Sequence, residues 1–127
     1  MRNGQWIAIG ALSAGIAVAM GAFGAHSLED RLVEAGHVGT WETAVRYQVW
    51  HALALILFAV VRRQTGSNSS ATGWLFLIGS LCFSGSLFAL ALGIPSAYIW
   101  PVTPAGGLLL LIGWVLFAVA ALRSSKD

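Results

Sequence analysis

Histidines are the residues of this chain best suited to proton transfer or metal binding, because a neutral imidazole both donates and accepts a hydrogen bond. The sequence has three, His26, His37 and His51. Tyr47 and Gln48 precede His51 by four and three residues, the spacing at which side chains on one helix meet. An ionisable residue in an apolar segment marks either a hydrogen-bonded network or a functional path. His51 is therefore either a hydrogen-bond node between helices or a titratable group in a polar cavity, with His26 as its second participant.

A second polar pair, Glu42 and Arg46, stands one helical turn apart in the favourable order, with the acid first. At 100° per residue this pair lies on a different helix face from His51. We expect Arg46 to anchor the helix by extending its charged end to the membrane interface. The candidate polar cluster comprises His26, Glu42, Arg46, Tyr47, Gln48 and His51.

The sequence offers no recognisable catalytic or metal-binding motif. A metal site needs three or four convergent ligands, whereas this chain has one cysteine, Cys82, within an apolar stretch. It contains no HExxH or CxxC motif, no phosphate-binding glycine loop and no evident Ser-His-Asp set. We expect no catalytic residue, no metal and no cofactor. An enzyme that acts on a lipid with His26 or His51 as a base is the weakest alternative.

The composition is that of a membrane protein. Of the 127 residues, 57% are hydrophobic and 9% are charged, compared with about 25% charged residues in soluble domains. Four apolar stretches, approximately 6–25, 43–61, 74–93 and 103–122, are each long enough to span the hydrocarbon core. We therefore predict an all-α membrane protein: one domain, 1–127, of four transmembrane helices in a compact bundle. Its surroundings are membrane lipids, and no nucleic-acid partner is expected.

The positive charges predict the orientation, because lysine and arginine near helix ends tend to stay in the cytoplasm. One side of the predicted bundle carries Arg2, Arg62, Arg63, Arg123 and Lys126. The other side carries Arg31 and Arg46, accompanied by Glu29, Asp30, Glu34 and Glu42. Both termini are therefore expected in the cytoplasm. Segment 64–73, rich in Ser, Gly, Asn and Thr, is expected to form a cytoplasmic connection without structure of its own.

The first outer loop contains signals for a short helix. Ser27 suits the N-cap, Asp30 the first turn, and Gly36 a stop. These signals predict a helix over 27–35 that lies in the interface across the outer mouth of the bundle.

Small residues recur at alternating spacings of three and four, which lets the backbones of membrane helices approach closely. The 6–25 helix carries Gly10, Ala14, Ala17, Gly21 and Gly24 on one face. The 74–93 helix carries Gly79, Cys82, Ser86, Ala89 and Gly93. We expect these stripes to line the closest helix contacts, so that leucine at position 21 or 79 weakens the bundle. A sparser series, Gly106, Gly113 and Ala120, suits a contact either inside the bundle or between copies.

Several motifs resemble a family of small membrane proteins known as domain of unknown function 423, which is related to the eukaryotic transmembrane protein 256. The resemblance rests on segments 21–26 (GAFGAH), 46–48 (RYQ), 51–55 (HALAL), 85–87 (GSL), 103–107 (TPAGG) and 113–114 (GW). The family often has tyrosine where this chain has Trp50. The resemblance implies a bacterial inner-membrane protein of unknown activity and supplies no catalytic residues.

Two functions follow as expectations. The leading one is a non-enzymatic membrane protein that acts through helix contacts, as a homo-oligomer or as an accessory subunit of a larger membrane complex. The alternative is a small transporter or channel with a polar cavity around His51, in which the 43–61 helix lines the path.

Overall fold

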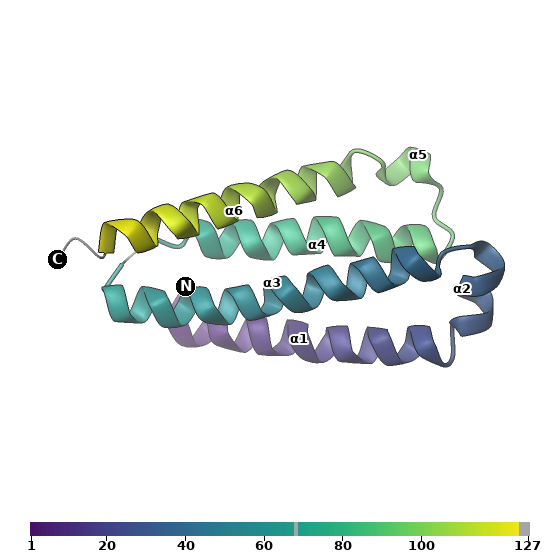
Figure 1. Cartoon of the computed structure of the whole chain (residues 1–127), viewed down its shortest axis with the longest axis horizontal. Helices are drawn as coiled ribbons and strands as arrows, with labels where there is room; N and C mark the ends of the chain where they lie inside the picture. Colours follow the sequence, from purple (N-terminus) through teal and green to yellow (C-terminus); the bar gives the residue numbers. More distant parts are fainter. Residues whose placement is uncertain (68, 125–127) are drawn as a thin grey trace.

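The computed structural model describes residues 1–67 and 69–124 of the chain. Its helices, in chain order, are α1 (Asn3–Ala25), α2 (Glu29–Ala35), α3 (Val38–Thr65), α4 (Ala71–Ala91), α5 (Ser96–Ile99) and α6 (Val102–Ser124) (Figure 1). Four of them, α1, α3, α4 and α6, are long and apolar enough to cross a membrane. The prediction of an all-α membrane protein with four spans is confirmed.

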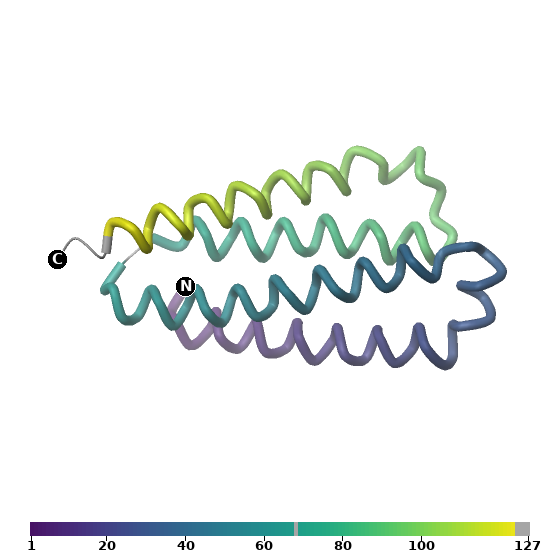
Figure 2. Tube along the Cα trace, in the orientation of Figure 1, coloured from purple at the N-terminus to yellow at the C-terminus, as the bar shows by residue number. Residues whose placement is uncertain are grey.

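The four long helices run antiparallel to their neighbours in the chain. The most extensive packing joins α1 to α3, α3 to α4, and α4 to α6, and the trace in Figure 2 shows this succession. The N-terminus, the α3–α4 connection and the end of α6 lie at one end of the bundle (Figure 1). Helices α2 and α5 lie at the opposite end.

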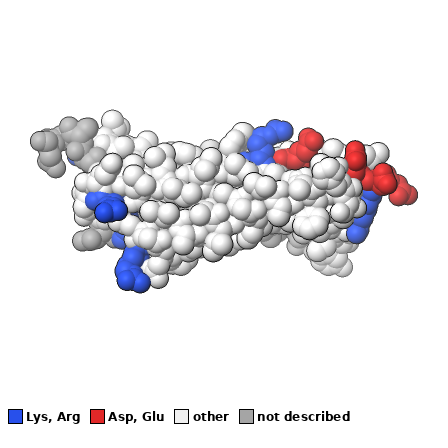
Figure 3. Space-filling model, turned by 90° about the horizontal axis from the view of Figure 1, so that it is seen from below, with Lys and Arg blue, Asp and Glu red and all other residues white. Residues whose placement is uncertain are grey.

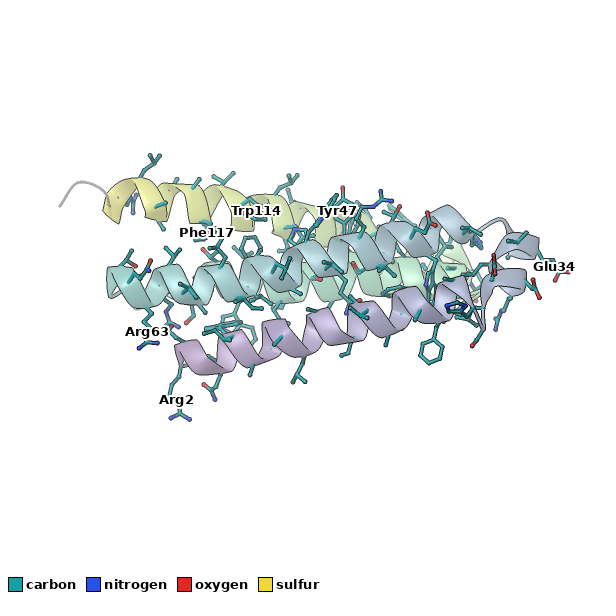
Figure 4. All side chains as sticks on the ribbon, turned by 60° about the horizontal axis from the view of Figure 1, so that its bottom comes forward. Arg2, Glu34, Tyr47, Arg63, Trp114 and Phe117 are labelled. Atoms are coloured by element: carbon teal, nitrogen blue, oxygen red, sulfur yellow. The ribbon has the colours of Figure 1, made fainter. Side chains whose placement is uncertain are left out.

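The charges lie near the two ends of the bundle. On the face shown in Figure 3, an uncharged belt separates a basic end from an end that carries all the visible acidic side chains. Arg2 and Arg63 lie at the end opposite Glu34 (Figure 4). Lys126, which the sequence assigns to the basic side, lies outside the described residues. This distribution is the one expected for a bundle whose middle meets lipid.

Each long helix begins before the apolar stretch that predicts it, and α3 also continues beyond the end of its stretch. Helix α3 begins at Val38 and continues to Thr65, and Gly66, with φ of 64°, provides its left-handed C-cap. The connection to α4 is therefore 66–70, shorter than the predicted 64–73. Hydrophobicity marks only the part of a helix that meets hydrocarbon, whereas the backbone hydrogen bonds continue until a capping residue stops them.

The predicted N-cap of the short helix is wrong. Helix α2 begins at Glu29, two residues after the position expected from Ser27, and Leu28 takes the N-cap without a side-chain hydrogen bond. The physical reason is that Leu28 packs on the small outer core formed by Leu32, Trp41 and Ala91. Because Leu28 is held there, the helix begins after Leu28 rather than at Ser27. The predicted stop at Gly36 is confirmed, because this residue is the left-handed C-cap, with φ of 69°.

Arg31 links α2 to the end of α4. Its Nη2 atom donates to the carbonyl oxygen of Leu92 at 2.7 Å, and Leu92 is the C-cap of α4. The last carbonyl groups of a helix lack partners within the helix and carry partial negative charge, so a guanidinium is a favourable cap. This contact attaches the short helix to a span that comes much later in the chain.

Helices α1 and α3 meet across small residues. A Cβ atom at Gly10 would lie 2.8 Å from the carbonyl oxygen of Ala52. At the other end, Gly24 leaves room for the indole of Trp41, whose Nε1 donates to Met20 O at 2.8 Å. Within the same stripe, Ala17 is buried, and Ala14 and Gly21 are half-buried.

Helices α4 and α6 meet in the same way. A Cβ atom at Gly79 would lie 2.8 Å from Leu110 Cδ2 and 3.1 Å from the carbonyl oxygen of Gly106. The hydroxyls of Ser86 and Thr103 share a hydrogen bond of 2.6 Å. Gly113 also faces α4, Cys82 and Ala89 are half-buried, and Ala120 is exposed.

Gly93 was predicted to extend the α4 stripe, and this assignment is wrong. Helix α4 ends at Ala91, and Gly93 has φ of 101° in the turn that follows. L-residues with side chains rarely adopt this conformation, so the glycine serves the turn rather than a helix contact.

We predict that Gly79→Ala destabilises the bundle by about 1–3 kcal/mol, because the added methyl group would overlap Leu110 and approach the α6 backbone. Gly21→Ala is the matched control, since its Cβ atom would lie 3.6 Å from Val45 Cγ1, an ordinary contact. Alanine also favours the helix. Thermal unfolding in detergent should give a lower midpoint for Gly79→Ala only. Equal midpoints for the two variants would contradict a tight α4–α6 crossing.

Candidate functional site

His51 is buried between three helices, with 4% of its surface exposed. Its Nδ1 atom lies 2.8 Å from the carbonyl oxygen of Tyr47, and Nε2 lies 3.1 Å from the indole Nε1 of Trp114 on α6. A carbonyl oxygen can only accept and an indole N–H can only donate. The two contacts therefore fit the neutral imidazole that is protonated at Nδ1. Both ring nitrogens are used in holding α3 to α6.

A lateral groove of about 640 Å³ opens beside His51, between α3 and α6. Figure 4 shows Tyr47 and Trp114 on this side of the bundle. The ring of Tyr47 lies 4.6 Å from that of Phe83, centroid to centroid, and Trp50 and Leu111 at the groove are 50% and 66% exposed. Most of the lining is apolar, so the groove suits lipid chains or an apolar helix better than ions.

Gln48 points to a different helix from His51. Its Nε2 atom donates to the backbone oxygen of Ser13 on α1 at 3.2 Å, with the Ser13 hydroxyl at 3.5 Å. Gln48 and the neighbouring Trp41 thus attach α3 to α1, whereas His51 attaches it to α6. The structure does not bring Gln48 and His51 into one polar cluster.

The other three candidate residues lie away from His51. Glu42 and Arg46 are exposed and line a surface cavity of about 540 Å³ beside α1 and α2. His26 is the C-cap of α1 and is also exposed, whereas His51 is buried against α4 and α6. His26 is therefore no partner of His51, and the six residues form separate contacts rather than one site.

Two serines on α4 line a small cavity that the sequence analysis missed. Ser80 and Ser84 are 8% and 2% exposed and line a small cavity of about 170 Å³ together with Ser13 and Gln48. Among the described residues, the Ser84 hydroxyl has no hydrogen-bond partner. The available signal was the pair of serines one turn apart in an otherwise apolar helix.

Metal ligands do not gather in the described part of the chain. Within residues 1–67 and 69–124, no three His, Cys, Asp or Glu side chains come close enough together to hold a metal ion. Cys82 is a free cysteine on α4, half-buried beside α6.

These features define an integral membrane protein of four helices, in which buried polar side chains join one helix to another. The chain belongs to the family described as protein of unknown function DUF423, whose model matches residues 20–107.

Relatives extend the match to nearly the whole chain. The UPF0382 membrane protein of Staphylococcus epidermidis (strain ATCC 12228 / FDA PCI 1200) is 42% identical over 118 residues, covering 93% of this chain and 95% of that protein. The UPF0382 membrane protein YwdK of Bacillus subtilis (strain 168) is 37% identical over 120 residues, covering 93% of this chain and 96% of that protein. No solved structure matches the chain.

We predict that Trp114→Phe lowers stability by about 1–3 kcal/mol, because it keeps an aromatic ring but leaves the buried Nε2 of His51 without a donor. Trp100→Phe is the control, since Trp100 is 69% exposed. Thermal unfolding should give a lower midpoint for Trp114→Phe than for Trp100→Phe. In a double-mutant cycle, the Trp114→Phe/His51→Phe variant should lose less stability than the sum of the losses in the two single variants. Additive losses would contradict a stabilising hydrogen bond.

Proposed function

We propose that this chain is a non-enzymatic protein of the bacterial plasma membrane that acts by lateral association, as a homo-oligomer joined through the outward face of α1. The observation that supports it is a second face of small residues on α1, directed away from the bundle. The membrane-protein relatives from Staphylococcus and Bacillus support the bacterial location.

Glycine and alanine form a stripe along this outward face, with the exposed Leu12 and Val18 at its edges. Its members, all exposed, are Gly4, Ala8, Ala11, Gly15, Ala19 and Ala22. Successive members are three or four residues apart, which keeps them on one side of the helix, roughly opposite the face that packs on α3. A Cβ atom at Gly4 or Gly15 would meet nothing within 4 Å. By contrast, large side chains such as Leu53 of α3 and Leu81 of α4 are 54% and 66% exposed.

Small residues on a lipid-facing surface give a second helix room to approach. Lipid supplies no hydrophobic force between helices, so association depends on close backbone packing, which glycine and alanine permit. Two copies would present the same face to each other, and a two-fold axis along the membrane normal would make the contact self-complementary. A second copy of the chain is thus the partner that we propose for this face.

The geometry at His51 gives less support to a transporter or channel. A permeation path needs polar groups directed into a wet cavity, whereas both ring nitrogens of His51 are engaged by Tyr47 and Trp114. The adjacent groove is largely apolar and opens sideways. An enzymatic role with His51 as the base has similarly little support, because both of its ring nitrogens are engaged in hydrogen bonds.

We predict that Gly15→Leu weakens self-association at least tenfold without unfolding the protein, because the side chain would fill the space needed by the second helix. Gly85→Leu is the matched control: this exposed glycine on α4 also has nothing within 4 Å of its Cβ position. Native mass spectrometry of protein released from its own membranes gives the copy number. A wild-type monomer, or equal effects of both changes, would refute assembly through α1. A reproducible complex with another protein would instead establish an accessory subunit.

The proposed orientation places both termini and the α3–α4 connection in the cytoplasm. In a Cys82→Ala background, Ser69→Cys should react with a membrane-impermeant maleimide only in inverted vesicles. Glu34→Cys, at the opposite end, should react only in right-side-out vesicles. The reverse pattern would contradict the orientation.

A further inference from the structure

A cavity of about 420 Å³ lies between α3, α4 and α6, at the end of the bundle that carries the N-terminus and the end of α6. Two arginines from different spans line it, Arg62 near the end of α3 and Arg123 near the end of α6. The rest of the lining divides into a hydroxyl-rich part, with Thr65 and Thr72, and an apolar part, with Phe117 among its members. This combination of charge, hydroxyls and apolar wall is that of an amphiphile site.

The guanidinium of Arg62 is held in position by the backbone. Its Nη1 atom donates to the carbonyl oxygen of Met1 at 2.8 Å, and Nε donates to that of Ser67 at 3.2 Å. These two bonds hold the guanidinium in place near the end of α3. A fixed guanidinium loses less conformational entropy when it binds an anion than a mobile one does.

Thr72 adds a hydrogen-bonding group inside the cavity. The side chain is only 6% exposed and lies in the first turn of α4. Its hydroxyl is one of the polar groups that line the cavity. A hydroxyl can donate a hydrogen bond, so a ligand with oxygen acceptors suits this position.

The charge at this end of the bundle favours an anion. Four of the five acidic residues in the sequence, Glu29, Asp30, Glu34 and Glu42, fall in or next to α2, at the opposite end, and the fifth is the last residue. In an anionic leaflet, each basic residue near the surface contributes about 1 kcal/mol of attraction. The arginines can therefore act on a headgroup without acidic competitors from the α2 end.

The apolar wall selects a lipid over a free anion. Phe58 and Phe117 meet edge to face across the cavity floor, with ring centroids 6.4 Å apart, and Leu116 and Val119 continue the apolar lining along α6. We propose that this cavity binds an anionic phospholipid, with its phosphate at Arg62 and Arg123 and an acyl chain along α6. A soluble phosphate would leave the apolar wall uncovered.

The test compares lipid retention by the full-length protein reconstituted with equal amounts of phosphatidylglycerol and phosphatidylcholine. Native mass spectrometry should show phosphatidylglycerol preferentially retained by the wild type. Arg123→Gln and Arg62→Gln should each lower this preference about fivefold, as expected from the loss of one basic contact. Thr72→Val should lower it less, because it removes only a neutral hydroxyl.

Arg63→Gln is the matched control, since Arg63 is adjacent in sequence and equal in charge but does not line the cavity. It should leave the preference unchanged. If all three arginine variants lose phosphatidylglycerol equally, the attraction belongs to the surface as a whole and the proposal fails. It also fails if added inorganic phosphate displaces the lipid completely. Should Arg62→Gln unfold, Arg123→Gln and Thr72→Val still decide the outcome.

Discussion

The hydrocarbon interior of a membrane provides no hydrogen-bond partner, so a polar side chain within a span is costly unless another part of the protein satisfies it. The contacts between spans follow from this constraint. Trp114 donates to His51, Gln48 donates to Ser13, and the hydroxyls of Ser86 and Thr103 pair with each other. Each bond fixes how far one helix is rotated about its own axis relative to the next. The few polar groups therefore determine which apolar residues face the core and which face lipid.

Packing at the helix crossings then follows from residue size. The backbones approach closely at Gly10 beside Ala52 and at Gly79 beside Gly106. Where the helices diverge, large rings fill the space, and Trp6 is completely buried, with its ring 5.9 Å from that of Phe58. Small residues at the crossings and large residues between them make the arrangement of the four spans specific, which hydrophobicity alone cannot do because lipid is equally apolar.

The fold was largely predictable from the sequence, and the site was not. Span length and charge bias are local properties, so four helices and the stop at Gly36 could be foreseen. The helix ends were less predictable because Gly66, rather than the loss of hydrophobicity, ends α3. Tyr47, Gln48 and His51 were predicted to share a face, yet Gln48 contacts α1 and His51 contacts α6. That division depends on the positions of both neighbouring helices, and no local pattern identifies Trp114 as the partner of His51.

The bond between Arg31 and the end of α4 has a consequence for biogenesis. The chain folds as two helical hairpins, α1 with α3 and α4 with α6, and the first leaves the ribosome before the second. Arg31 belongs to the first hairpin, whereas its acceptor, Leu92, follows the third span. This contact can therefore form only after α4 has been made, so the end of the bundle that carries α2 stays incompletely closed until the second hairpin docks. In a chain truncated before α4, Arg31 would have no such acceptor and α2 would lose its attachment to the later spans.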